Sequence, residues 1–305
     1  MADVGFHAGE RAVQERAGTR DEAERLSPML EPAELAGGIV GFLAERTFAV
    51  LTARDGDGRL WSSPLTGPAG FLEAVSADTL MIHAQPLAGD PLHGLPAGQQ
   101  VGLVVFEFAI RRRVRLNGTL RAVAGGSLAL DVEQAYGNCP QYIHQRLLAP
   151  DGPGQSDPGE VRHGAALSPE DVELIRAADT FFLGTTNPER GSDSSHRGGS
   201  PGFVRVDDGS RLWWPDYPGN NLFNSLGNIA VNPEASLLFF NFETGRTLQV
   251  SGTAAIDWDA AGRPGDDGQT GRRVVVAVQH AVAGRLLPAR QVADSPYPHH
   301  LALTD

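Results

Sequence analysis

The sequence contains one cysteine, Cys139, among 305 residues. A single thiol excludes an internal disulfide and any zinc site built from several cysteines. Its residue type favours a role as a small buried apolar group, with a catalytic thiol as the alternative. Histidines offer no replacement, because His83 and His93 stand in separate predicted turns and His299-His300 is an isolated pair near the end. We therefore expect no metal site.

The chain also lacks long apolar runs and an excess of positive charge. No stretch approaches the length of a membrane span, and the first residues have no apolar core for a signal peptide, so we expect a cytoplasmic protein. Lys and Arg total 25 against 37 Asp and Glu, a net charge of −12, which argues against a nucleic-acid or anionic-membrane partner. The exception is the cluster Arg111, Arg112, Arg113 and Arg115, which is either a solvated strand end or a ligand or interface site.

The sequence contains an internal repeat. A shift of about 134 residues places Leu103–Phe108 on Leu237–Phe242 and Arg112 on Arg246. With small gaps, Leu51–Ala53 meets Gly184–Thr186. The repeat predicts two copies of one β-rich domain, each introduced by a helix. We expect an N-terminal helical extension over 1–30, a first domain over 31–148, a linker over 149–166 and a second domain over 167–305.

The local pattern is mostly that of short strands. Apolar runs recur at about ten-residue spacing between Gly, Pro and Asp turns, which is typical of a barrel or sandwich. We expect helices over 8–26, 32–46, 129–148 and 168–179, the last begun by Ser168 as the capping residue and Pro169. Two apolar runs, 203–206 and 212–214, flank a polar turn and predict a β-hairpin. The expected fold class is mainly β with flanking helices (α+β).

Two donor-rich loops flank that hairpin. The first, Ser195–Gly199, combines a hydroxyl, an imidazole and a guanidinium with glycines that let backbone approach a ligand closely. The second, Pro215–Asn221, offers amide donors just before a predicted helix, and such loops can hold a phosphate. His196 is the candidate general acid or base, with plain hydrogen bonding to backbone or cofactor as the alternative.

These segments resemble one known family. The resemblance is carried by 195–204, 215–221 and 247–252 in the second half, and by 6–14, 111–113 and 138–143 in the first. They are similar to the flavin-binding split-barrel family related to pyridoxamine 5′-phosphate oxidase, in its longer, tandem-domain form. The resemblance covers most of the chain and implies two tandem split β-barrel domains. It also implies a flavin at the interface of two barrels, so that the chain forms an intramolecular pseudo-dimer or a homodimer.

The resemblance implies FMN as the cofactor and a flavin-dependent oxidoreductase that transfers hydride between the flavin and a small-molecule substrate. In the oxidase the second loop carries an Arg-Lys pair, where this chain has Asn220 and Asn221. The phosphate charge would then be met by Arg197, Arg205 or Arg246. The predicted cofactor-binding residues are Ser195, His196, Arg197, Gly198, Arg205, Asp216, Asn220, Asn221, Arg246, Thr247 and Gln249.

The first half lacks the second half's cofactor loops. Residues 61–68 stand where the second half has the His-Arg-Gly-Gly loop, so we expect the first half to be mainly a structural partner whose Arg111–Arg115 reach the shared site. Two other functions stay open. One is a non-catalytic flavin- or haem-binding module or scaffold, and the other is a reductase that uses the deazaflavin F420.

Overall fold

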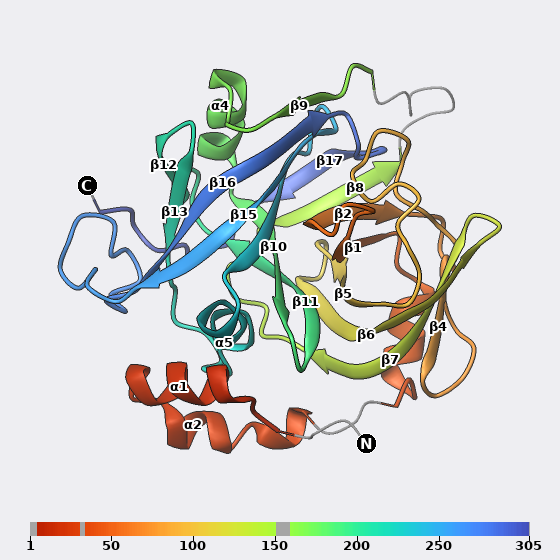
Figure 1. The fold of residues 1–305 in the computed structure, drawn as a ribbon, viewed down its shortest axis with the longest axis horizontal. Helices are drawn as coiled ribbons and strands as arrows, with labels where there is room; N and C mark the ends of the chain where they lie inside the picture. The colour runs from red at the N-terminus through yellow and green to blue at the C-terminus, as the bar shows by residue number, and fades with distance from the viewer. Residues whose placement is uncertain (1–4, 31–33, 151–158, 305) are drawn as a thin grey trace.

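The computed structural model describes residues 5–30, 34–150 and 159–304, drawn as a ribbon in Figure 1. Two antiparallel sheets with the same strand order make up most of the molecule. The first runs β2-β1-β5-β6-β7-β4-β3 and the second β11-β10-β14-β15-β16-β13-β12, with β9 added beside β16. The fold is thus mainly β, and the two sheets correspond to two tandem split barrels, as the sequence predicted.

The elements of the first half are α1 (Ala8–Ala17), α2 (Arg20–Glu24), the 3₁₀ helix η1 (Ser27–Leu30), α3 (Gly38–Ala44), β1 (Phe48–Arg54), β2 (Leu60–Thr66), β3 (Leu72–Ala74), β4 (Thr79–Ile82), β5 (Gln99–Glu107), β6 (Arg112–Ala124), β7 (Ser127–Gly137) and β8 (Gln145–Pro150). Those of the second half are β9 (Arg162–Gly164), α4 (Pro169–Ala177), β10 (Thr180–Asn187), β11 (Gly191–Gly198), β12 (Arg205–Asp208), β13 (Arg211–Pro215), α5 (Asn224–Val231), β14 (Glu234–Asn241), β15 (Arg246–Asp257), β16 (Arg273–Gly284) and β17 (Ala289–Ser295).

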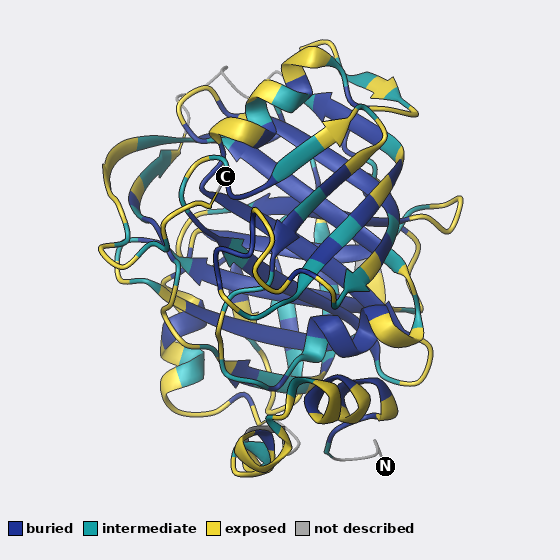
Figure 2. Ribbon diagram, turned by 90° about the vertical axis from the view of Figure 1, so that its left-hand side faces the viewer, coloured by how far each residue is buried: buried dark blue, intermediate teal, exposed yellow. Residues whose placement is uncertain are grey.

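Four apolar clusters lie within the described residues, and Figure 2 shows the strands around the three larger ones as largely buried. Each sheet encloses one core, and a third core is shared between the two halves. In the shared core the rings of Phe48 and Phe106 pack against Phe182 at centroid distances of 5.9 and 5.5 Å. The two halves therefore bury apolar surface against each other, which fixes their relative position.

The crossing of the halves requires glycine at one point. A Cβ added to Gly102 on β5 would lie 2.5 Å from the backbone of Asp193 and Ser194 on β11. No side chain fits at that distance, so the sequence permits this strand approach only because position 102 is glycine. The approach brings β6 of the first half beside β11 of the second, where the candidate site lies.

The structure corrects three local predictions. Ser195–Gly198, expected in a loop, lie in strand β11, where they pair with β10. Residues 129–137 belong to strand β7 and residues 145–148 to β8 rather than to a helix. Leu128, Leu130 and Val132 are buried with period two, as in a half-buried strand. The repeat register is one residue off in the first strand, since Leu51 and Leu183 hold equivalent places opposite Leu103 and Leu237.

The predicted capping residue Ser168 is confirmed, since it accepts from the Asp171 amide in a capping box. Other predictions are not decided. The domain boundaries stay a prediction, and part of the predicted linker, 151–158, lies outside the described residues.

Segments near the two ends of the chain also connect the halves. Strand β17 pairs with β8, and α1 packs on α5 (Figure 1). Across the described ranges, no helix is long and apolar enough to span a membrane.

Candidate functional site

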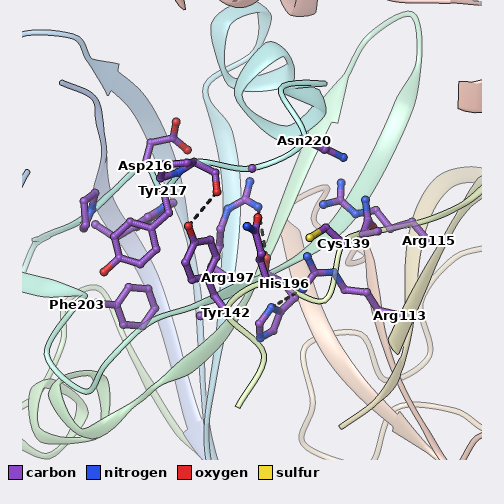
Figure 3. Close-up of a pocket in the computed structure, with 17 residues that line it drawn as sticks. Arg113, Arg115, Cys139, Tyr142, His196, Arg197, Phe203, Asp216, Tyr217 and Asn220 are labelled. Atoms are coloured by element: carbon purple, nitrogen blue, oxygen red, sulfur yellow. Dashed lines mark hydrogen bonds between the residues drawn. The ribbon is translucent and has the colours of Figure 1, made fainter. Parts of the chain in front are cut away.

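A cavity of about 110 Å³ lies where the two halves meet (Figure 3). Its first-half wall comes from β6 and the segment after β7, and its second-half wall comes from β11, β13 and the loop that follows β13. Of the predicted residues, the structure brings His196, Arg197, Gly198, Asp216 and Asn220 together here. The other lining residues are Arg113, Arg115, Asn138, Cys139, Gln141, Tyr142, Phe203, Trp214, Pro215, Tyr217, Pro218 and Gly219.

Three arginines converge on this cavity. Arg113 and Arg115 share a face of β6 because side chains alternate along a strand, and Arg197 comes from β11. Arg115 forms an ion pair with Asp193 at 3.1 Å. Within the described part of the chain, neither Arg113 nor Arg197 has a carboxylate partner. The cavity therefore holds more positive charge than the protein itself neutralises.

The environment of these arginines opposes their charge. Burial, followed by repulsion from Arg115, lowers the pKa of Arg113 to about 9 and that of Arg197 to about 10. Both groups stay protonated near neutral pH, so the repulsion persists until an anion arrives. This charge pattern is typical of a site for a phosphate or carboxylate group.

His196 is buried beneath Arg113 and does not supply the imidazolium expected of a proton donor. Arg113 Nη1 donates to His196 Nδ1 at 2.9 Å, and the ring packs against Phe106 at a centroid distance of 4.9 Å. Burial, with Arg113 and Arg197 adding repulsion, lowers the pKa of His196 well below its usual value. The ring is therefore neutral at pH 7 and acts as an acceptor that orients Arg113.

Asp193 connects the two halves behind the cavity. Its carboxylate accepts from Arg115 Nη1 and from Ser225 Oγ at 3.1 Å each, and it also meets Asn117 and Tyr136 at 3.4 and 3.5 Å. Arg115, Asn117 and Tyr136 belong to the first half, whereas Asp193 and Ser225 belong to the second. The sequence analysis missed Asp193, because its partners lie far away in the chain and no local motif marks it.

Aromatic side chains form the other end of the cavity. The rings of Tyr142 and Tyr217 lie 5.0 Å apart, and Phe203 lies 6.2 Å from Tyr217. Tyr142, which comes from the first half, donates its hydroxyl to the carbonyl of Pro218 at 3.0 Å. Asp216 turns away from the three arginines to pair with Arg272 at 2.9 Å. The cavity thus has a cationic end and a flat aromatic end.

A second cavity of about 90 Å³ adjoins the first at the start of α5. The two share Arg115, Arg197 and Asn220, and the second adds Asn221. The residue that precedes α5, Phe223, has φ 57° and offers no side-chain cap, so the first amide groups of the helix have no capping acceptor. Free amides and Arg115 together make this place suited to an anion.

The N-terminal helices hold the loop between the two cavities. Asn221 and Phe223 have φ of 58° and 57°, an uncommon backbone conformation for residues other than glycine. Gln14 of α1 donates to the carbonyl of Leu222 between them at 3.1 Å, and Asn221 donates to Glu22 of α2 at the same distance. These contacts keep the loop in a strained form that it would not hold alone.

The remaining predicted residues lie outside both cavities. Arg205 forms an ion pair with Asp267 at 2.9 Å, and Arg246 is exposed at the start of β15. Thr247 is buried and donates to the carbonyl of Gly284. Gln249 is buried and donates to Ser63 and Asp90 of the first half, away from both cavities. Ser195 lies beneath the cavity, where its hydroxyl donates to the carbonyl of Leu183.

Residues 111–115 split between surface and site. Arg111 donates to the carbonyl of Ile143, Arg112 is exposed over the ring of Phe42, and only Arg113 and Arg115 turn into the cavity. Arg112 thus fits the solvated strand end, whereas Arg113 and Arg115 lie between the two halves. The prediction for Cys139 as a buried apolar group is wrong: the residue is exposed and lines the cavity.

Known proteins are similar to parts of this chain. The family model described as pyridoxamine 5′-phosphate oxidase matches residues 167–264. No curated protein matches. A Clostridium acetobutylicum protein described as related to general stress protein 26, of the pyridoxinephosphate oxidase family, is 14% identical; the match covers 40% of this chain and 90% of that one, with a TM-score of 0.29.

Two further solved structures match a similar share of the chain. The FAD-binding protein from Mycobacterium smegmatis is 16% identical, covering 41% of this chain and 98% of its own, with a TM-score of 0.27. An F420 reductase is 18% identical, covering 40% of this chain and 94% of its own, with a TM-score of 0.26.

Proposed function

We propose, from the membership of residues 167–264 in the pyridoxamine 5′-phosphate oxidase family, that this chain is an FMN-dependent oxidoreductase. FMN would bind between the two halves, in an intramolecular pseudo-dimer. The observation that carries the proposal is the arginine cluster, because Arg113 and Arg197 line the cavity without a carboxylate partner among the described residues.

The residues present fit the demands of this cofactor. Its phosphate would be held by Arg115 and by the uncapped start of α5, next to Asn220 and Asn221. Buried Nε atoms of Arg113 and Arg115 have no hydrogen-bond partner among the described residues, so donors remain free for a ligand. A flat ring system would find Tyr142 and Tyr217 at the aromatic end of the cavity.

FMN, when bound, supplies a ring that accepts or donates hydride. The chain's own residues would position the flavin and stabilise its charge. Arg113 and Arg197 would place positive charge beside a bound flavin, which would favour its reduced, more negative form. His196 orients Arg113 through its Nδ1 atom, which makes it a positioning residue in this proposal. Tyr142, through its bond to the carbonyl of Pro218, joins the two halves at the aromatic end of the cavity.

A titration of the purified chain with FMN, followed by flavin fluorescence, tests the proposal. We expect saturable binding with one FMN per chain. Arg197→Leu should weaken it about 10- to 100-fold, the loss expected when one charged hydrogen bond is removed. The matched control is Arg112→Leu, since Arg112 is exposed over Phe42 and lies outside both cavities. No binding, or an equal loss in both variants, would reject the FMN site. Preferential binding of F420 would favour the deazaflavin reductase instead.

A non-catalytic flavin-binding module is the second candidate, and one observation favours it. Three lining groups that could transfer a proton are neutral or engaged: His196 is neutral, Asp216 pairs with Arg272, and Tyr142 donates to Pro218. Anaerobic reduction separates the two functions. An oxidoreductase should show loss of the flavin absorbance on addition of a nicotinamide donor or a candidate substrate, whereas a module should keep it.

A further inference from the structure

We propose that Cys139 is a modification site: it forms mixed disulfides with small anionic disulfides, and the adduct competes with the ligand of the arginine cavity. The placement of the thiol supports the modification itself. The consequence for FMN rests on the proposed function, whereas the site itself does not.

The thiol of Cys139 is exposed and lines the cavity together with Arg113 and Arg197. In Figure 3 it lies on the arginine side, away from Tyr217 and Phe203. Cys139 and Arg113 line the same cavity. The sulfur is therefore reachable from solvent and adjoins fixed positive charge.

A separate observation indicates that an anion binds beside it. Arg113 is 9% exposed, its Nε atom has no hydrogen-bond partner in the described ranges, and no carboxylate there pairs with its guanidinium. This demand for negative charge exists whatever residue stands at 139. A disulfide reagent with a carboxylate would place that carboxylate on Arg113 and its sulfur next to Cys139.

The chemistry is thiol–disulfide exchange. The Cys139 sulfur, having lost its proton to water, attacks one sulfur of the reagent. One S–S bond forms and one breaks, and the second half of the reagent leaves as a thiolate. No further oxidant is needed, because the disulfide itself is reduced as Cys139 is oxidised. The retained half carries its carboxylate to the arginines of the cavity, the groups that another anion would need, so the two compete.

The test compares two disulfides on the purified chain without flavin. 5,5′-Dithiobis(2-nitrobenzoate) is dianionic and bis(2-hydroxyethyl) disulfide is neutral; each rate is divided by the rate of the same reagent with the neutral thiol 1-thioglycerol. Attraction by fixed charge raises association about 10-fold or more, so we expect a normalised preference of about 10-fold for the anionic reagent. The preference should disappear in 1 M salt and fall in Arg113→Met but persist in Arg112→Met. Cys139→Ser should abolish labelling.

Equal normalised rates, or a preference that salt leaves unchanged, would overturn the site. Competition is measured separately with inorganic pyrophosphate, which should slow labelling by the anionic reagent several-fold and leave the neutral one unchanged. Unslowed labelling would overturn the competition. If FMN binds the unmodified chain, labelling should abolish that binding and dithiothreitol should restore it. Failure of FMN to bind at all would count against the proposed function and leave the labelling result standing.

Discussion

The two halves of this molecule share one strand order but differ in what they place at equivalent positions. Arg113 stands opposite Phe106 in β5–β6, and Thr247 stands opposite Phe240 in β14–β15, so Thr247 occupies the place of Arg113. By the same register Gln249 occupies the place of Arg115. One end of the pair of barrels thus has two arginines where the other has neutral side chains.

That difference decides which end of the pair of barrels has a cavity that can take a ligand. At the neutral end, Gln249 Nε2 donates to Ser63 Oγ at 2.9 Å and to Asp90 Oδ2 at 3.0 Å. Ser63 in turn donates to Asp90, and all three residues are buried. The donors of Gln249 and Ser63 all have acceptors, although Gln249 Oε1 has no partner among the described residues. The arginines at the other end repel each other and leave donors free. We learn that a cavity persists where the protein's own groups cannot neutralise one another.

The largest effect is expected from removing Asp193, which connects the two halves behind the arginine cavity. Asp193→Ala removes the only carboxylate paired with Arg115 in the described structure and leaves a buried charge uncompensated. The free energy of unfolding should fall by about 3–5 kcal/mol, measured by urea denaturation. Asp131→Ala, which removes an exposed partner of Arg121, is the matched control and should cost at most about 1 kcal/mol. Similar losses in the two variants would contradict the role of Asp193.

The closed end should respond to pH through Asp90. Burial raises the pKa of Asp90 from 3.8 to about 6, although Ser63, Leu92 and Gln249 all donate to it. The folded state therefore binds the proton more tightly, and its stabilising contribution is complete below about pH 4 and lost as pH rises through about 6. Compared with Asp90→Asn, the native chain should gain up to about 3 kcal/mol of unfolding free energy between pH 7 and pH 4. Parallel stability–pH curves for the two proteins would refute this assignment.

A smaller change at the closed end sharpens the comparison. Gln249→Leu removes the amide that joins Ser63 to Asp90, and the loss of a buried hydrogen-bonding group should cost about 1–3 kcal/mol of stability. FMN affinity should stay within about twofold, because Gln249 lies outside both site cavities. Thermal unfolding and flavin titration on the same preparation provide the two measurements. A loss of FMN affinity larger than the loss in Arg197→Leu would mean that the sites have been assigned to the wrong ends.

The smallest effect is expected from the N-terminal helix α1, which packs on α5 beside the cavities. Gln14→Leu removes the hydrogen bond to the Leu222 carbonyl and allows the strained loop to relax. One neutral hydrogen bond contributes about 0.5–1.5 kcal/mol, so FMN affinity should fall about 2- to 10-fold while the folded state persists. Gln99→Leu, a substitution far from the loop at a side chain that also bonds to backbone, is the control. An unchanged FMN affinity in Gln14→Leu would show that α1 does not support the site.

Local sequence predicted the elements whose signals are short-range. Ser168 caps α4 as expected, and the hairpin of β12 and β13 follows from apolar runs around a polar turn. Residues 129–148 were misassigned because Ala, Glu and Gln favour a helix, whereas the tertiary packing of Leu128 and Leu130 selects a strand. Within the site, donors and glycines marked both segments, although Ser195–Gly198 lie in strand β11 rather than in a loop. Five predicted residues line the cavity.

The other site features depend on contacts between distant segments. Arg113 meets His196 across 83 positions of sequence, and Arg115 meets Asp193 across 78. No local pattern states which arginine of a run turns inward or which carboxylate it meets. The exposure of Cys139 and the engagement of Arg205 by Asp267 were hidden for the same reason.

The sequence by itself determined the strand-rich fold, the repeat of one topology and the supply of donor-rich loops in the second half. These properties follow from side-chain periodicity and turn chemistry, which act over a few residues. Only the tertiary structure decided where charge is left unbalanced, because that depends on which side chains two crossing strands bring together. Burial between β6 and β11 then gives the unpaired arginines their demand for an anion, since water no longer screens them.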